Sequence, residues 1–436
     1  MSDAAPPQAA HTREIDIVIF GATGYTGRWC LNYLKKQQQR SLAGLRVAVA
    51  GRSDAKLRAA LADEGLDPRA VPVVVADAGD AASLEAMCRR AFLVVTLCGP
   101  FVLYGRPLVE AAVRCGTHVL DMTGEFTFVR ALSEEFDEAA RAKGVFLLSM
   151  VGFDCVPASL LSLYLHRSAA RAASAVEVAS VHAACEFVNV AGFSGGTLHT
   201  TAVTLQTLRL RDLSPFSLLS KALREAPDIA PHLNPPGGFP MKFFVTPSWL
   251  FGGWAAPGLL SESNQKATRA THALLGFDSS YGEVVKDSSL LLAVAHFLLL
   301  WVLVPILSLP LVGDWLRRAF LPAPGEGPTR EAAAKSGFRF LAAGFNRAGA
   351  RSVSAVMRST LDVYIFSAAS ILEAAAALVR GEFTAEAVAA RARPSGWGRG
   401  GVVTPAALLG DALLRRLEAA GCEFRHTFAS TPWDQI

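Results

Sequence analysis

The chain has 436 residues, of which 51% are hydrophobic and 18% charged, and its formal net charge at pH 7 is +4. This length is enough for two or three domains with a large core. The low charge, without a basic stripe interleaved with aromatic residues, argues against a nucleic-acid partner. Seven cysteines are scattered with no Cys-x-x-Cys pair. That pattern indicates reduced thiols inside the cell, and neither a disulfide framework nor a metal site is expected.

The N-terminal stretch 1–12 contains an acidic residue and two prolines but no apolar run. It is expected to be a disordered lead and not a secretory signal or a mitochondrial presequence. The first folded domain is therefore expected to begin at about residue 13.

A glycine-rich turn follows the first apolar run. Ile15–Phe20 leads directly into Gly21, Gly24 and Gly27, and a helix is expected over 28–36. A strand, a tight glycine turn and a helix together bind the pyrophosphate of a dinucleotide, because the free N–H groups of the helix face the anion. The spacing here is G-x-x-G-x-x-G and not G-x-G-x-x-G, so the turn alone is a weak signal.

Short apolar runs alternate with helical stretches after this turn. Strands are expected at 15–20, 46–50, 71–76, 92–97, 117–120 and 145–150, and helices at 28–36, 54–64, 83–90, 107–115 and 133–143. Six repeats of this alternation indicate a doubly wound parallel sheet. The sequence therefore predicts an α/β protein with a dinucleotide-binding Rossmann domain over 13–155.

The end of the second strand favours NADP over NAD. Arg52 and Ser53 stand at its tip and Lys56 one turn later, and such cations and hydroxyls suit a ribose 2′-phosphate. Asp54 is close enough to keep NAD as the alternative, because an acidic residue there binds the 2′-hydroxyl. A solvated loop charge is the other interpretation of Arg52.

The ends of the next two strands supply further candidates. Asp77 ends the third strand and could reach the adenine, or cap the following helix. Tyr104 follows the fourth strand and could orient the substrate or donate a proton, although a structural role is also open. The predicted cofactor-binding residues are Gly21, Thr23, Gly24, Tyr25, Thr26, Gly27, Arg52, Ser53, Lys56, Asp77, Cys98, Gly99 and Pro100.

The αβ alternation ends after residue 155, and a second, mixed α/β domain is expected over 156–365. The small-residue turn 193–197 opens a helix at 198–208, and strands are expected at 338–345 and 352–360. The C-terminal region, 366–436, contains an apolar helix at 366–379. It also contains an amphipathic helix at 404–420, with Thr404 as its N-cap and Pro405 at the first helical position.

The segment 288–313 carries no formal charge. Pro305 and Pro310 are expected to break it, because proline lacks an N–H and clashes with the preceding turn. The unbroken part, 290–304, would be about 22 Å long, against a bilayer core of about 30 Å. Insertion into one leaflet or a lipid-droplet monolayer is favoured, with a core hairpin or a dimer interface as the alternative. Interfacial anchors would then be Trp301, Trp315, Arg317 and Arg318.

Several motifs resemble the saccharopine dehydrogenase-like oxidoreductases, a family that includes mycobacterial trans-acting enoyl reductases. The motifs, in order, are FGATGYTGR (20–28), AGRS (50–53), CGPFVLYG (98–105), GTHVLDMTGE (116–125), GFDCVP (152–157), SGGT (194–197), PGEGPT (324–329) and GGVVTPAALLG (400–410). The resemblance implies a Rossmann domain, an inserted α/β domain and a C-terminal part, 366–436, that packs back on the first domain. It also implies membrane or lipid-droplet association, as in animal relatives, but no catalytic residue can be carried over from the family.

Packing of the C-terminal part on the first domain would conflict with a single membrane crossing, because the two parts would then lie on opposite sides. We therefore expect a monotopic, cytosol-facing protein. The leading hypothesis is an NADPH-dependent reductase of a lipid-like carbonyl or enoyl substrate, with Tyr104 or Asp154 as proton donor. The alternatives are a non-catalytic dinucleotide-binding scaffold at the lipid surface, and a soluble amino-acid reductase whose apolar segment forms a homodimer interface.

Overall fold

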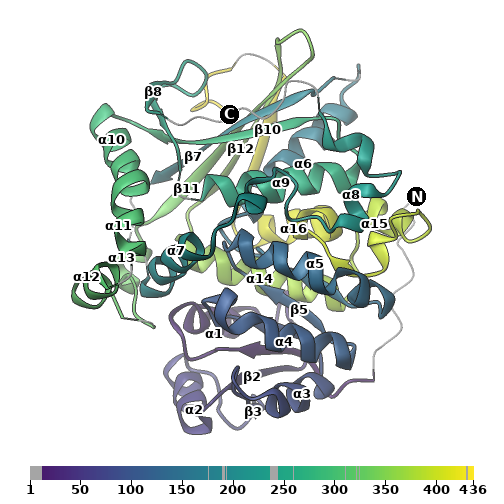
Figure 1. The fold of residues 1–436 in the computed structure, drawn as a ribbon, viewed down its shortest axis with the longest axis vertical. Helices are drawn as coiled ribbons and strands as arrows, with labels where there is room; N and C mark the ends of the chain where they lie inside the picture. The colour runs from purple at the N-terminus through teal and green to yellow at the C-terminus, as the bar shows by residue number, and fades with distance from the viewer. Residues whose placement is uncertain are drawn as a thin grey trace.

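The computed structural model describes residues 12–174, 176–188, 192, 194–235, 244–258, 260–309, 311–320, 322–323, 325–428 and 431–436. Most of the expected N-terminal lead, residues 1–11, and Pro310 lie outside these residues, as do the side chains of Arg317 and Arg318. The described chain is built around two sheets of seven strands each. The N-terminal part of the chain forms the lower half of Figure 1, and the second sheet lies above it.

The first sheet confirms the predicted Rossmann architecture. Its strand order is β13-β6-β5-β4-β1-β2-β3, and every pair is parallel. Its strands are β1 (Ile15–Phe20), β2 (Val47–Gly51), β3 (Val73–Val75), β4 (Ala91–Thr96), β5 (His118–Asp121), β6 (Phe146–Leu148) and β13 (Gly401–Val402). The first six follow the 3-2-1-4-5-6 order of dinucleotide-binding domains. β1 and β4 are buried along their whole length, as their predominantly apolar sequences predict. The exception in β1 is Asp16, which is buried in an ion pair with Arg46.

The connecting helices of this domain are α1 (Tyr25–Gln37), α2 (Asp54–Asp63), α3 (Ala81–Arg90), α4 (Phe101–Cys115) and α5 (Phe126–Ala142). The last two begin about two turns earlier than the sequence predicts. The carboxylate of Glu125 explains the early start of α4, because it accepts hydrogen bonds from the N–H groups of Phe101 and Val102, both at 2.7 Å. These bonds satisfy two orphan donors of the first turn, and Pro107 is accommodated inside the helix.

The second sheet is mixed, with the order β14-β12-β11-β7-β10-β9-β8. β7 and β10 pair in parallel, and the other described strand pairs of this sheet are antiparallel. Its strands are β7 (Ser180–Val188), β8 (Thr246–Pro247), β9 (Trp254–Ala256), β10 (Ser280–Asp287), β11 (Gly337–Phe345), β12 (Arg351–Ser359) and β14 (Glu423–Thr427). The other helices of this half are α6 (Val156–Arg171), α7 (Gly195–Thr207), α8 (Lys221–Glu225), α9 (Ser261–Leu275), α13 (Arg330–Ala333), α15 (Ala385–Ala390) and the short 3₁₀ turns Leu210–Leu213, Ala230–Leu233 and Trp397–Arg399.

The C-terminal region contributes to both sheets. β13 extends the first sheet and β14 the second. Along the chain, α14 (Val363–Val379) lies between β12 and β13, and α16 (Pro405–Ala419) lies between β13 and β14. α14 packs against α1 and α16, and the Thr404 hydroxyl accepts a hydrogen bond from Ala407 N, which confirms the predicted cap of α16.

One helical rod, Leu290–Ser308, is long and apolar enough to cross a membrane. It consists of α10 (Leu290–Leu298), a π-helical stretch (Leu299–Leu303) and α11 (Val304–Ser308), and α12 (Val312–Phe320) follows. The prediction that Pro305 breaks the helix is wrong, because a π stretch immediately before the proline accommodates its ring without ending the rod. The 19 residues span about 28 Å.

This rod lies at the edge of the molecule, at the left of Figure 1, far from β2 and β3. Only 17% of the residues in its most apolar stretch are buried inside the chain. The alternative that this segment is a core hairpin of a single chain is therefore wrong. The exposed apolar residues of the rod and of the chain that follows it are Leu290, Leu291, Leu292, Val294, Leu298, Trp301, Val302, Leu303, Ile306, Leu309, Leu311, Val312 and Trp315.

A buried ion pair links the C-terminal helices to α1. Glu373 on α14 is 1% exposed, and its carboxylate accepts bonds from Arg416 Nη1 at 2.8 Å and the Tyr33 hydroxyl at 2.9 Å. Replacing Arg416 with methionine would leave this carboxylate buried without its cation. We expect R416M to lower the free energy of unfolding by about 3–5 kcal/mol, measured by urea denaturation.

The matched control is R425M, because Arg425 forms its ion pair with Glu423 at the exposed surface. That substitution should cost about 1 kcal/mol or less. If both variants lose the same free energy of unfolding, burial does not make the Arg416 ion pair more stabilising than the exposed Arg425 pair.

Candidate active site

A cavity of about 1180 Å³ opens at the carboxyl edge of the first sheet. One half is lined by the ends of β1, β2, β4 and β5 and by the segment after β3, where ligands bind in doubly wound sheets. The other half is lined by α7, α9, β10 and the apolar rod. The two halves form one continuous space that joins the predicted nucleotide site to the second domain.

The glycine turn at the end of β1 is shaped for a phosphate. Gly21 has φ of +91°, and a Cβ there would lie 2.9 Å from Cys98 Sγ. A Cβ on Gly27 would lie 2.5 Å from the carbonyl oxygen of Gly21, so only glycine fits between helix and turn. Gly24 is the N-cap of α1 and provides no side chain. The first N–H groups of this 13-residue helix therefore have no side-chain cap at a wall of the cavity.

Three residues, Arg52, Ser53 and Lys56, were predicted to bind the 2′-phosphate, and of these only Arg52 lines the cavity. Ser53 instead caps α2, where its hydroxyl accepts a bond from Lys56 N at 3.4 Å, and Lys56 is exposed outside the lining. Arg52 and Asp77 both line the cavity beside Cys98. Burial raises the pKa of the Cys98 thiol to about 12, although the Thr96 hydroxyl and the charge of Arg52 lower it.

The remaining predicted cofactor residues are distributed as follows. Thr23, Tyr25, Thr26, Asp77, Cys98 and Gly99 line the cavity, and Pro100 does not. Asp77 accepts a bond from Gly79 N at 2.9 Å, whereas Asp80 caps α3. The helix-capping interpretation of Asp77 is therefore wrong.

The two predicted proton donors have different surroundings. Tyr104 lies on α4 and lines the cavity while half-exposed to solvent. Asp154, in the segment after β6, lines the cavity more deeply, and its Oδ2 lies 2.5 Å from where a Cβ on Gly124 would stand. Burial alone raises the pKa of Asp154 to about 7. Asp154 is therefore a carboxyl group that is partly protonated near neutral pH, whereas an ordinary aspartate is fully ionised there.

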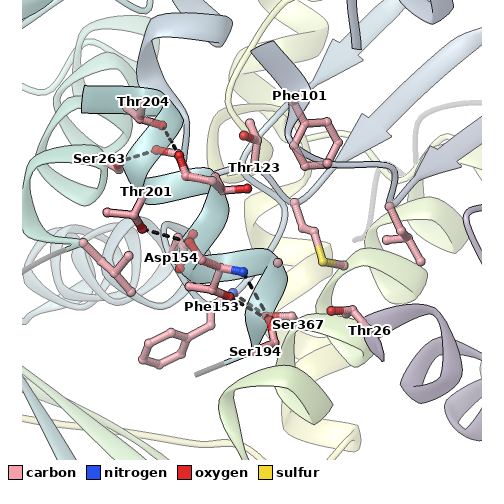
Figure 2. A pocket seen from close by; sticks show the side chains of 18 of the residues that line it. Thr26, Phe101, Thr123, Phe153, Asp154, Ser194, Thr201, Thr204, Ser263 and Ser367 are labelled. Atoms are coloured by element: carbon pink, nitrogen blue, oxygen red, sulfur yellow. Dashed lines mark hydrogen bonds between the residues drawn. The ribbon is translucent and has the colours of Figure 1, made fainter. Parts of the chain in front are cut away.

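Hydrogen bonds from two helices fix the backbone around Asp154 (Figure 2). Phe153 N donates to Ser367 Oγ of α14 at 2.9 Å, and Ser263 Oγ of α9 donates to Gly124 O at 2.7 Å. Figure 2 also shows Thr201 and Thr204, both from α7, on the same side of the cavity. The carboxyl group thus sits where the first domain, α7, α9 and α14 meet.

Two further cavity residues were not predicted from the sequence. Glu283 on β10 accepts bonds from Asn264 Nδ2 at 2.7 Å and the Tyr281 hydroxyl at 2.8 Å, and burial raises the pKa of Glu283 to about 7. Tyr364 on α14 accepts a bond from Ser194 N at 2.6 Å. An acidic residue within a buried strand could have indicated Glu283, but no sequence signal brings Tyr364 to a site that begins near residue 21.

Comparison with known proteins identifies the family. Residues 17–148 match the family described as saccharopine dehydrogenase NADP binding domain. The chain is also 30% identical to a Mycobacterium tuberculosis protein named provisionally as a trans-acting enoyl reductase. That match runs over 440 residues and covers 96% of this chain and 99% of that protein. The chain belongs to the saccharopine dehydrogenase-like oxidoreductases. It is therefore an NADP-dependent oxidoreductase.

Two other similarities extend over nearly the whole chain. A trans-acting enoyl reductase of Mycobacterium ulcerans is 30% identical over 430 residues, covering 94% of this chain and 97% of that protein. The solved structure of apo histidine-tagged saccharopine dehydrogenase (L-Glu forming) from Saccharomyces cerevisiae has a TM-score of 0.48 and 12% sequence identity. The match covers 95% of the present chain and 100% of the yeast chain.

The site of this saccharopine dehydrogenase-like protein fits NADP at both phosphate positions. The N-terminal turn of α1, with Gly24, Tyr25 and Thr26, would hold the pyrophosphate. Arg52, the only Lys, Arg or His among the described lining residues, would bind the 2′-phosphate.

We therefore expect R52A to weaken NADPH binding at least tenfold, since it removes a charge-assisted contact worth about 1.5–3 kcal/mol. NADH affinity should stay within about twofold, because NADH has no 2′-phosphate. Isothermal calorimetry measures both constants. The matched control is K56A, which removes an exposed cation just outside the cavity lining. Unchanged NADPH affinity in R52A would contradict the assignment, and an equal loss in K56A would assign the phosphate to both cations.

Proposed function

We propose that this protein reduces an enoyl or carbonyl group of a lipid-like substrate with NADPH, at the surface of a membrane or lipid droplet. The observation that carries the proposal is the continuous cavity. It starts at the glycine turn, passes Asp154 and ends at Leu300, Trp301 and Val304 of the apolar rod. A substrate that fills this space would have its reactive group near the nucleotide and its apolar part at the rod.

The charges of the lining argue against an amino-acid substrate. Beyond Arg52 the described lining holds no Lys, Arg or His, while Asp154, Glu262 and Glu283 supply carboxyl groups. A substrate with several carboxylates would find no cation in the substrate half, and desolvating its charges would be costly. An uncharged apolar chain has no such cost, so the soluble amino-acid reductase is the less suitable alternative.

Asp154 is the proposed proton donor. NADPH, when bound, supplies a hydride to one carbon of the substrate, and the other end of the reduced bond needs a proton. Asp154 is partly protonated near pH 7 because its carboxyl group is buried. It lies in the cavity at the junction of the two domains, with its backbone fixed by Ser367. The mycobacterial relatives are named as enoyl reductases, which favours an enoyl group as the acceptor.

The position of the apolar rod supports insertion parallel to a lipid surface. α10 packs on β9 and β10, and α11 packs on α7. A helix attached to its own domain along one side cannot be surrounded by lipid, whereas its exposed face can enter one leaflet. We therefore propose a monotopic, cytosol-facing protein, although the length of the rod no longer argues against a span.

D154N should lower kcat by about 10²-fold or more, with NADPH affinity unchanged, measured on an enoyl thioester by NADPH oxidation. Because the acid form is the active one, kcat should be high below pH 7 and decrease as pH rises through about 7. Glu283, with a pKa of about 7 in the same cavity, is tested separately as E283Q. Full activity in D154N together with a loss in Y104F would transfer the role to Tyr104. Absence of turnover by the native protein on enoyl and carbonyl substrates alike would refute the reductase proposal.

The membrane proposal is tested by flotation with phospholipid vesicles. The native protein should float, and the double variant L291K/L298K should float several-fold less, because it places charges on the exposed face of the rod. The matched control is V75K, on an exposed apolar residue of β3, which lies at the bottom of Figure 1 and away from the rod. A native protein that stays with the soluble fraction as a dimer, and becomes monomeric in L291K/L298K, would instead identify the rod as a homodimer interface.

A further inference from the structure

We infer that the hydrocarbon chain of the substrate leaves the cavity between α7 and the apolar rod, and that Trp301 at this mouth discriminates between short and long chains. This inference rests on the proposed function and assigns a specificity-determining residue to the same site. It follows from the two faces of the rod, from the surface opposite it, and from the partial exposure of Trp301.

The rod presents different residues to the cavity and to the outside. Leu300, Trp301, Val304 and Pro305 line the cavity, and these positions lie on one face of a helix. The intervening Val302 and Leu303 and the following Ile306 do not line the cavity and are exposed. The same helix therefore borders the cavity on one side and the surroundings of the protein on the other.

Trp301 is the residue at which the two faces meet. It lines the cavity and is nevertheless 47% exposed, whereas Val304, one turn further, is 3% exposed. A large side chain that is both cavity wall and outer surface marks an opening of the cavity on this side. The opening coincides with the π-helical stretch Leu299–Leu303, and such stretches frequently occur at functional sites.

The opposite wall of the mouth is the C-terminal half of α7 and the residue that follows it. Thr201 and Thr204 line the cavity, and Leu205 and Leu208 line it while partly exposed. Gln206 Nε2 donates to Ser308 O at 2.9 Å, which ties α7 to the end of the rod. The wall thus changes from hydroxyl groups inside to leucines at the rim. That gradient suits a molecule with a polar reactive head and an apolar tail.

A short substrate would fit inside the cavity and would not contact Trp301. A long one would extend through the mouth along the indole and out into the surrounding lipid, without resting on the outer face of the rod. Binding of the tail would then add hydrophobic stabilisation at Trp301 only for long chains. Chain-length preference should therefore depend on this side chain, and reduction of short substrates should not.

The test compares W301A with V302A on crotonyl and hexadecenoyl thioesters in detergent micelles. W301A should lower kcat/KM for the hexadecenoyl substrate about tenfold, mainly through KM, and leave the crotonyl value within twofold. W301F should restore most of the loss. V302A removes a neighbouring exposed side chain outside the lining and should change neither value. NADPH affinity and thermal unfolding show whether each variant is folded.

If W301A leaves the ratio of kcat/KM for the two thioesters unchanged, the inference is overturned while the reductase function stands. An equal change in V302A would also overturn it, because the effect would then reflect partitioning of the outer face into micelles. If the native protein reduces neither thioester, calorimetry of hexadecenoyl thioester binding to the NADPH-bound protein decides separately. Binding that W301A weakens about tenfold supports the exit path, and equal or absent binding refutes it.

Discussion

The close approach of α1 to the turn before it is the contact on which the nucleotide half of the structure depends. Gly27 packs against the carbonyl of Gly21, and Gly21 in turn packs against the thiol of Cys98 at the end of β4. A side chain at either glycine would push the helix, the turn and the neighbouring strand apart. These contacts hold the start of α1 at the carboxyl edge of the sheet, so its N–H groups face a cavity that also reaches the second domain.

A second constraint on the site is the burial of acidic side chains in the cavity and beside it. Glu125 satisfies the first turn of α4, while Asp154 and Glu283 stand inside the cavity with pKa values of about 7. Burial raises all three pKa values, since carboxylates are poorly solvated away from water. Burial therefore has different consequences at Glu125 and at Asp154. The difference is that two backbone N–H groups occupy Glu125 and no hydrogen bond accounts for the pKa of Asp154.

The sequence predicted those strands and helices whose apolar residues are the ones that pack in the core. The six αβ repeats correctly predicted the first sheet because a buried parallel strand is an apolar run flanked by helices. α9 was missed because its residues are mostly polar, yet Lys266 and Arg269 are buried and bonded to backbone carbonyls. Buried polar residues that are hydrogen-bonded in this way do not add to the apolar periodicity by which a helix is recognised in a sequence. In the site, Arg52 could be placed from strand order, whereas Tyr364 could not, because only the tertiary fold brings α14 to the first sheet.

The two residues of β13 have a consequence for how the chain acquires its structure. Gly401 and Val402 pair with β6, so the first sheet receives its last strand from a point near the end of the chain. During synthesis, residues 13–155 emerge long before that strand. Until then β6 is an open sheet edge, and Glu373, which binds Tyr33 of α1, is not yet in place. The first sheet therefore acquires its last strand only after the second domain has been synthesised, and a chain that ends before β13 would retain an unpaired strand edge at β6.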